Sequence, residues 1–161
     1  MSRREIDGIS GWSLVTPFMG QMPAEMLEIV EKCESPIEQL FVCALCLVIL
    51  TADPEIRPKI DVQVPIGKYR ADVVVIHPNG APRIVIECDG AAFHKDIARD
   101  VRRTAVIEEY GYRVFRVTGS EIHHNPLARA QILLREVGLI PTKPKPMSPK
   151  EVNDFSILGA G

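Results

Sequence analysis

The 161-residue sequence contains 46% hydrophobic and 25% charged residues, a composition typical of one soluble globular domain. Its formal net charge of −2 at pH 7 excludes a surface that is basic throughout, so any basic surface for nucleic acid must be local. The longest apolar run, Leu40–Leu50, is far shorter than the ~20 residues that span a bilayer, and no apolar signal-peptide segment follows the first residues. We therefore expect neither a membrane span nor a signal peptide.

Four cysteines lie in apolar or helical segments, as is typical of proteins in the reducing cytoplasm: Cys33, Cys43, Cys46 and Cys88. Cys43 and Cys46 form a CxxC, but no second Cys or His pair stands at the spacing of a zinc site. We interpret both as small buried hydrophobic side chains, with a metal or redox role as the alternative. The predicted location is cytoplasmic.

In chain order, residues 1–34 predict an irregular N-terminal extension with one helix over Pro23–Cys33. Ser35-Pro36-Ile37-Glu38 predicts the sharp start of a second helix, because it supplies a serine N-cap, a proline at the first position and a glutamate at the third. This helix runs to about Leu50 and is apolar nearly all round, which indicates burial. Residues 51–58 predict a loop rich in helix breakers.

Three strands are predicted next, over Ile60–Ile66, Tyr69–Ile76 and Arg83–Cys88. In the first, a period of two places Ile60, Val62 and Val64 on one face. The connections are short and Asn79-Gly80 is a hairpin signal, so the three strands predict an antiparallel meander. The third strand is mostly apolar and is expected near the centre of the sheet.

A third helix is predicted over Ile97–Tyr110 and ends at Gly111, and a fourth strand follows over Tyr112–Val117. Because a helix connects the third strand to the fourth, these two strands are expected to be parallel, with a right-handed crossover. Asn125-Pro126 predicts a final helix that runs to about Val137.

The predicted fold class is α/β, in the order helix, three-strand antiparallel meander, helix, parallel strand, helix (αβββαβα), with the mixed sheet sandwiched by helices. We assign this domain to residues 35–138 and a Pro-rich basic C-terminal tail to residues 139–161.

Two predicted neighbouring strands carry acids at positions that face each other. The period of two turns Glu87 and Asp89 to one face and Cys88 to the other. A hairpin centred near Asn79-Gly80 pairs positions whose numbers sum to about 159, which places Asp72 opposite Glu87. Two opposed carboxylates repel each other unless a cation lies between them, and a hard divalent ion such as Mg²⁺ or Mn²⁺ fits carboxylate ligands.

Each of these acids also has a structural alternative. Glu38 can complete a capping box by bonding the amide of Ser35. Asp89 begins a common Asp-Gly turn pair, and Arg83 or Arg70 could pair with Glu87.

Three arginines of the third predicted helix, Arg99, Arg102 and Arg103, fall opposite the repeat formed by Ile97, Val101 and Ala105. The simplest interpretation is a solvated helix face, and the alternative is a stripe that contacts phosphates beside the acids.

Several motifs resemble one nuclease superfamily. Asp72, the hairpin and Glu87-x-Asp89 resemble the PD-(D/E)xK signature, and the element order is similar to the restriction-endonuclease-like core. Within that superfamily, the chain looks closest to the small domains related to very-short-patch-repair endonucleases. The motifs that carry this likeness are SPIEQLF, YRADVVV, IECDG followed by a histidine, RDVRR and GYRVFRV, and they span roughly Cys33 to Val137.

The resemblance implies a metal site with Mg²⁺, for which Mn²⁺ would substitute. Asp72, Glu87 and the backbone carbonyl of Cys88 would be ligands, Glu38 would present a further carboxylate, and His94 would act as a base or phosphate contact. Nucleic acid would be held by basic residues around the site: Lys68, Arg70, Arg99, Arg102 and Arg103.

The sequence departs from the superfamily at position 89, where the general signature has lysine and this chain has aspartate. Asp89 could bind a second metal ion instead, and Lys95 or His94 could supply the positive charge. The structural zinc site of the repair enzymes has no counterpart in this sequence.

These features predict a metal-dependent endonuclease that hydrolyses phosphodiester bonds in DNA, with RNA as the other candidate substrate and with a nicking, repair, restriction or mobile-element role. The alternative is a catalytically inactive nuclease-fold module that binds nucleic acid or a protein partner. An unrelated metabolic α/β domain is disfavoured, because the chain has neither a Gly-rich phosphate loop nor a nucleophile elbow. A monomer would nick one strand, whereas a homodimer could cut both.

Overall fold

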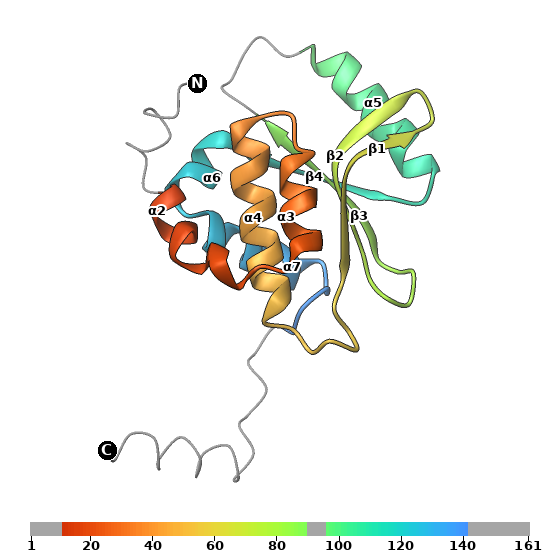
Figure 1. Ribbon diagram of the computed structural model, residues 1–161. Coiled ribbons are helices and arrows are strands. Elements are labelled where there is room, and N and C mark those ends of the chain that lie inside the picture. Colours follow the sequence, from red (N-terminus) through yellow and green to blue (C-terminus); the bar gives the residue numbers. More distant parts are fainter. Residues whose placement is uncertain (1–10, 90–95, 142–161) are drawn as a thin grey trace, which may run out of the picture.

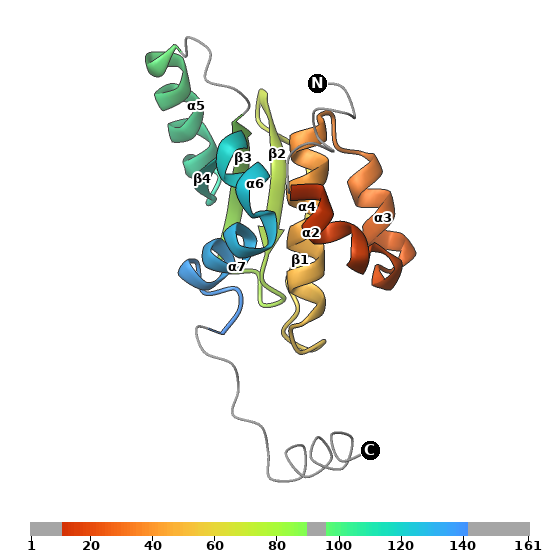
Figure 2. The same ribbon diagram turned by 90° about the vertical axis from the view of Figure 1, so that its left-hand side faces the viewer.

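The computed structural model describes residues 11–89 and 96–141, which form a mixed four-stranded sheet with helices on both faces (Figures 1 and 2). Helix α5 (Ile97–Glu109) covers one face, and the other described helices lie on the opposite face (Figure 2). The predicted α/β fold class and its αβββαβα order are confirmed.

The sheet order is β1-β2-β3-β4, with strands Lys59–Ile66, Tyr69–Ile76, Arg83–Asp89 and Arg113–Thr118. Strands β1 to β3 form the predicted antiparallel meander, and β4 runs parallel to β3. The β2–β3 register pairs Val73 with Ile86 and Ile76 with Arg83, so the predicted sum of 159 is confirmed. Strand β3 is internal, as its apolar sequence predicted.

Three long helices begin and end close to their predicted bounds. In α4 (Pro36–Leu50), the Ser35 hydroxyl accepts a hydrogen bond from the Glu38 amide at 3.2 Å. Helix α5 is followed by Gly111, whose φ of 88° suits glycine at the end of a helix. Helix α7 (Pro126–Glu136) is capped by the side chain of Asn125.

The N-terminal segment contains more helix than the sequence pattern predicts. Helix α3 (Ala24–Glu31) lies within its predicted range, and α2 (Gly11–Val15) and the 3-10 helix η1 (Thr16–Gln21) precede it. Such short helices hold too few turns to show a hydrophobic period. Val15 and Met22 nevertheless lie in the main core, so this part of the extension packs on the domain.

Helix α6 (Gly119–His124) was not predicted, although the sequence contains its start signal. Thr118 and Glu121 form a complete capping box, in which each side chain bonds the other residue's amide. This T-x-x-E pattern is the usual signature of a helix N-terminus.

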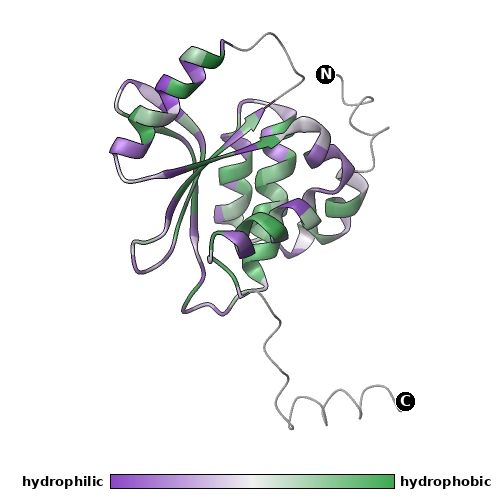
Figure 3. Ribbon diagram, turned by 180° about the vertical axis from the view of Figure 1, so that it is seen from behind, coloured by the Kyte–Doolittle hydropathy of each residue, from purple (hydrophilic) through white to green (hydrophobic). Residues whose placement is uncertain are grey.

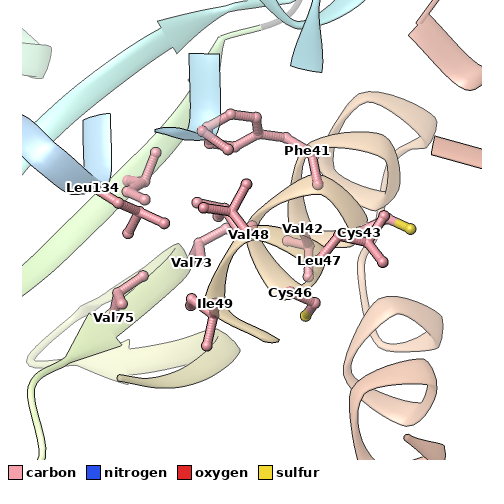
Figure 4. Close-up of a cluster of buried hydrophobic side chains, with 14 of the residues drawn as sticks. Phe41, Val42, Cys43, Cys46, Leu47, Val48, Ile49, Val73, Val75 and Leu134 are labelled. Carbon is pink, nitrogen blue, oxygen red and sulfur yellow. The ribbon is translucent and has the colours of Figure 1, made fainter. Parts of the chain in front are cut away.

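The main core lies between the sheet and helix α4, which is buried on nearly all sides (Figures 3 and 4). Phe41 of α4 and Leu134 of α7 approach Val73 and Val75 of the sheet in this core (Figure 4). A smaller cluster on the opposite face joins Val74 and other sheet residues to Ile107 of α5.

The cysteines behave as buried hydrophobic side chains in this core. Cys33, Cys43 and Cys46 are buried free thiols, and Cys88 is half-buried. Burial raises the pKa of Cys43 to about 11 and that of Cys46 to about 12, so both thiols are protonated at neutral pH and are poor metal ligands.

Helix α5 turns Arg103 and Ile107 toward the sheet, whereas the predicted apolar stripe is exposed, as are Arg99 and Arg102. Ile97 is 76% exposed and Val101 is 63% exposed, whereas the side chain of Arg103 is only 26% exposed. The interpretation of the three arginines as a solvated face is therefore wrong for Arg103. Its partner is a carboxylate on β3, so this ion pair joins the helix to the sheet face on which Ile107 also packs.

The first two strands change face at Gln63. This residue has a φ of 54°, which is uncommon for a side chain other than glycine, and the pair it would form with Asp72 is missing from the β1–β2 ladder. Ile60 and Val62 pack in the main core, whereas Val64 packs in the smaller cluster. The prediction of one common face for these three residues is therefore wrong for Val64.

None of the helices formed by residues 11–89 and 96–141 is long and apolar enough to cross a membrane.

His123 of α6 makes the fold sensitive to acid. The residue is buried, neither ring nitrogen has a hydrogen-bond partner among the described parts of the chain, and burial lowers its pKa below the ordinary 6.5. The folded state therefore favours the neutral ring, whereas the unfolded state binds the extra proton below about pH 6.5. The free energy of unfolding therefore decreases as the pH drops below that value.

We expect His123→Leu to reduce the loss of stability between pH 8 and pH 5.5, as measured by urea unfolding at both values. His124→Gln, a change at an exposed neighbour on the same helix, should keep the wild-type loss. Equal pH dependence in all three proteins would show that His123 does not contribute.

Candidate active site

Asp72 of β2 and Glu87 of β3 lie side by side at the predicted position. One Asp72 oxygen, Oδ2, accepts a hydrogen bond from the Cys88 amide at 3.0 Å, and the Asp72 carboxyl also hydrogen-bonds the Glu87 carboxyl. Glu87 is only 6% exposed. Asp72 thus bonds β3 through its side chain, and its backbone pair with Gln63 of β1 is missing from the β1–β2 ladder.

The carboxyl of Asp72 holds its proton more tightly than an ordinary aspartate. Burial, the charge of Glu87 and the bond between the two carboxyls together raise the pKa of Asp72 from its ordinary 3.8 to about 7, while the bond from the Cys88 amide opposes the shift. A carboxyl pair with a raised pKa is a chemical sign of a place where a cation would be favoured.

Arg103 of α5 already supplies one positive charge to this pair. Its Nε and Nη2 atoms donate to Oε1 of Glu87 at 3.3 and 2.8 Å, and Nη2 also donates to the carbonyl of Arg70 at 2.7 Å. The guanidinium lies 5.3 Å from the centre of the Tyr69 ring. Glu87 is thus held from a helix that follows it in sequence.

The arginines that the sequence offered as partners for Glu87 are engaged elsewhere. Arg83 donates to the hydroxyl of Tyr112 at 2.6 Å, and Arg70 pairs with Glu34. The structural alternative, in which Arg83 or Arg70 pairs with Glu87, is therefore wrong.

Asp89 ends β3 on the same side as Glu87, and it pairs with a second arginine. Its Oδ1 atom lies 3.3 Å from Nη1 of Arg116 on β4, and the same nitrogen lies 3.6 Å from Asp100 on α5. Position 89 therefore joins a network of alternating charge.

Glu38 of α4 is buried near the pair and has different partners from those of a capping box. Its Oε2 atom accepts hydrogen bonds from the Glu34 amide at 3.1 Å and from Gln63 Nε2 at 2.9 Å. The capping-box alternative is thus half right, since Ser35 caps the helix but the Glu38 carboxylate does not bond the Ser35 amide. Its charge contributes to the raised pKa of Asp72.

The donor set suits a hard cation held by few protein ligands. No group of three His, Cys, Asp or Glu side chains within residues 11–89 and 96–141 is arranged to hold a metal ion. Asp72 and Glu87 do supply adjacent carboxylates, and Mg²⁺ commonly binds one or two carboxylates while it keeps several waters. The pair fits that ion in chemistry, with the carbonyl of Cys88 as the predicted third oxygen.

Basic side chains surround the acids in two open pockets. One pocket, of about 620 Å³, is lined by Gln63, Lys68, Tyr69, Arg70, Asp72, Arg99 and Arg103. The other is lined by four acids and three arginines: Glu87, Asp89, Asp96, Asp100, Arg99, Arg103 and Arg116. Arg102 is exposed and lines neither pocket. His94 and Lys95 lie outside the described residues.

A model of the restriction-endonuclease-like family REase_MTES_1575 matches residues 54–137, just over half of the chain. The chain belongs to this family. The match runs from β1 to the end of α7, and thus includes Asp72, Glu87 and Arg103 but not Glu38. No curated protein and no solved structure matches the chain at a significant level.

Membership of REase_MTES_1575 confirms the predicted likeness to the restriction-endonuclease-like superfamily and points to a nuclease. The closer likeness to very-short-patch-repair endonucleases stays a prediction. Two residues of the site, Gln63 and Arg116, carried little sequence signal. Arg116 could have been found from strand order, because β3 and β4 are parallel neighbours and the register pairs it with Glu87.

Proposed function

We propose that this protein is a metal-dependent endonuclease that hydrolyses phosphodiester bonds in DNA. The observation that supports the proposal most is the adjacent pair of Asp72 and Glu87, which line two pockets that share Arg99 and Arg103. Membership of a nuclease family gives the pair its most economical interpretation. The proposal includes a cytoplasmic location and keeps RNA as another candidate substrate. It leaves open whether the protein is a monomer or a homodimer.

Asp72 and Glu87 would hold Mg²⁺ or Mn²⁺ together with the carbonyl of Cys88. A bound ion of this kind lowers the pKa of a water and neutralises charge on a phosphoryl group. The carboxyl of Asp72, whose pKa is raised, has to lose its proton before it can act as a ligand, so ion binding would be coupled to proton release.

The basic residues of the same pocket would bind the sugar-phosphate backbone. Lys68, Arg70 and Arg99 line the pocket next to Asp72, where contacts to phosphates would fix the register of the strand. Arg102 would add an outer contact from the exposed side of α5. Such contacts do not read the base sequence.

The positive charge that lysine gives in the general signature has several candidate sources here. His94 and Lys95 are the predicted ones, and Arg103 stands closest to Glu87 among the described arginines. Because the carboxyls of Asp72 and Glu87 lie next to each other, we assign the first ion to this pair. Asp89, which pairs with Arg116, and Glu38, which bonds Gln63, would have a role only in a second ion.

A non-catalytic module that binds nucleic acid or protein is the second candidate. The ion pairs of Glu87 with Arg103 and of Asp89 with Arg116 favour it, because they neutralise acids that a nuclease would use. The destabilising placement of Asp72 beside Glu87 disfavours it, since a purely structural site has no use for such a pair.

Cleavage assays on single-stranded, nicked, mismatched and duplex DNA, and on RNA, would test the proposal. With Mg²⁺ or Mn²⁺ we expect cleavage of at least one substrate, no cleavage with EDTA, and loss of cleavage in Asp72→Ala and Glu87→Ala. Glu55→Ala, a change at an exposed acid in the loop before β1, should cut like the wild type. Metal-independent cleavage, or full activity in both site variants, would reject the nuclease assignment.

A further inference from the structure

Arg103 neutralises the carboxylate of Glu87 that a metal ion would also bind. Its Nη2 and Nε atoms donate to Oε1 of Glu87 at 2.8 and 3.3 Å, and charge-assisted bonds of this kind are stronger than neutral ones. Glu87 is 7% exposed at its side chain and has little freedom to offer a different face. A divalent ion and Arg103 would therefore compete for the negative charge of the same carboxylate.

Arg103 has other contacts that it can keep when its guanidinium leaves Glu87. Its Nη2 atom also donates to the carbonyl of Arg70, and its guanidinium lies near the face of Tyr69, so both contacts lie on the side of the basic pocket. Its side chain is 26% exposed, against 7% for Glu87. The arginine is thus the more exposed partner of the pair and the one with other contacts to keep when it leaves Glu87.

We infer that Arg103 and the divalent ion compete for Glu87, so that ion binding transfers the guanidinium from Glu87 to the basic pocket, where it meets a phosphate of the nucleic acid. This inference rests on the proposed function and adds a regulatory step to it. The arginine keeps the carboxylate neutralised until the ion arrives, and ion binding then strengthens the grip on the substrate. By thermodynamic reciprocity, a bound phosphate would also raise the affinity for the ion.

Calorimetric titration with Mn²⁺ would measure the competition directly. We expect Arg103→Gln to bind Mn²⁺ about tenfold more tightly than the wild type, because a charge-assisted pair no longer has to be broken. Arg102→Gln removes the same charge one residue away on the exposed side of α5, so it controls for long-range electrostatics and should stay within about twofold of the wild type. Glu87→Gln should bind Mn²⁺ weakly, both as a single variant and in combination with Arg103→Gln.

The outcomes separate this inference from the proposed function. Equal or weaker Mn²⁺ binding in Arg103→Gln would overturn the competition and leave the nuclease proposal standing. Absence of Mn²⁺ binding in every protein, Arg103→Gln included, would overturn both.

A measurement on the wild type removes any dependence on how the variant folds. In ¹⁵N–¹H spectra, the Nε–H resonance of Arg103 should shift when Mg²⁺ is added, whereas that of Arg83, which bonds Tyr112, should stay in place. Saturable Mg²⁺ binding with an unmoved Arg103 resonance would overturn the inference.

Discussion

Asp72→Asn is expected to stabilise the fold at pH 8 by on the order of 1–2 kcal/mol and to lower metal-dependent cleavage by about 10³-fold or more. Asparagine mimics the protonated acid, so it can still accept from the Cys88 amide and can donate to Glu87. It removes the repulsion that raises the pKa of Asp72, but it also removes the charge that a divalent ion requires. The stability figure is reduced for the partial solvent exposure of the site.

The raised pKa of Asp72 determines how the stability of the fold changes with pH. The pKa of Asp72 rises from 3.8 to about 7 on folding, so between these values the folded state binds more protons than the unfolded state, and the free energy of unfolding falls as the pH rises. Urea unfolding at pH 5 and pH 8 should therefore show that Asp72→Asn gains most at pH 8. Asp61→Asn, at an exposed position on β1, serves as the control. A variant less stable than the wild type at pH 8 would contradict this account.

Leu134→Ala is expected to lower the free energy of unfolding by about 2–5 kcal/mol. Leu134 of α7 is fully buried against α4 and the sheet, so truncation leaves a cavity in the main core (Figure 4). Urea unfolding would measure the loss.

Ile132→Ala, on the same helix, is the matched control. Ile132 is 48% exposed, and the expected change is within about 0.5 kcal/mol. Similar losses in the two variants would mean that α7 does not pack on the core as described.

Local sequence signals predicted most of the fold because the relevant contacts are local. The Ser35 cap, Gly111 and the Asn79-Gly80 hairpin each fix an element boundary or a register within a few residues. The face of Val64 was predicted wrongly, because the left-handed backbone at Gln63 interrupts the period of two and glutamine gives no sequence warning of it.

The candidate site was predictable only in part for a related reason. Hairpin register was enough to bring Asp72 and Glu87 together. The pairing of Glu87 with Arg103 depends on how α5 lies over the sheet, and the apolar repeat of that helix pointed to the opposite face. Ion pairs between distant elements leave no periodic trace in the sequence.

The backbone conformation of Gln63 has a consequence for protein engineering. A non-glycine residue with a φ of 54° costs about 1–2 kcal/mol, and glycine would release that strain. Glycine would also remove the amide that bonds Glu38 and the side chain that lines the pocket beside Asp72. A screen for heat resistance alone would thus favour Gln63→Gly, although this change removes a side chain that lines the candidate site. Selection at this position therefore has to score function together with thermal tolerance.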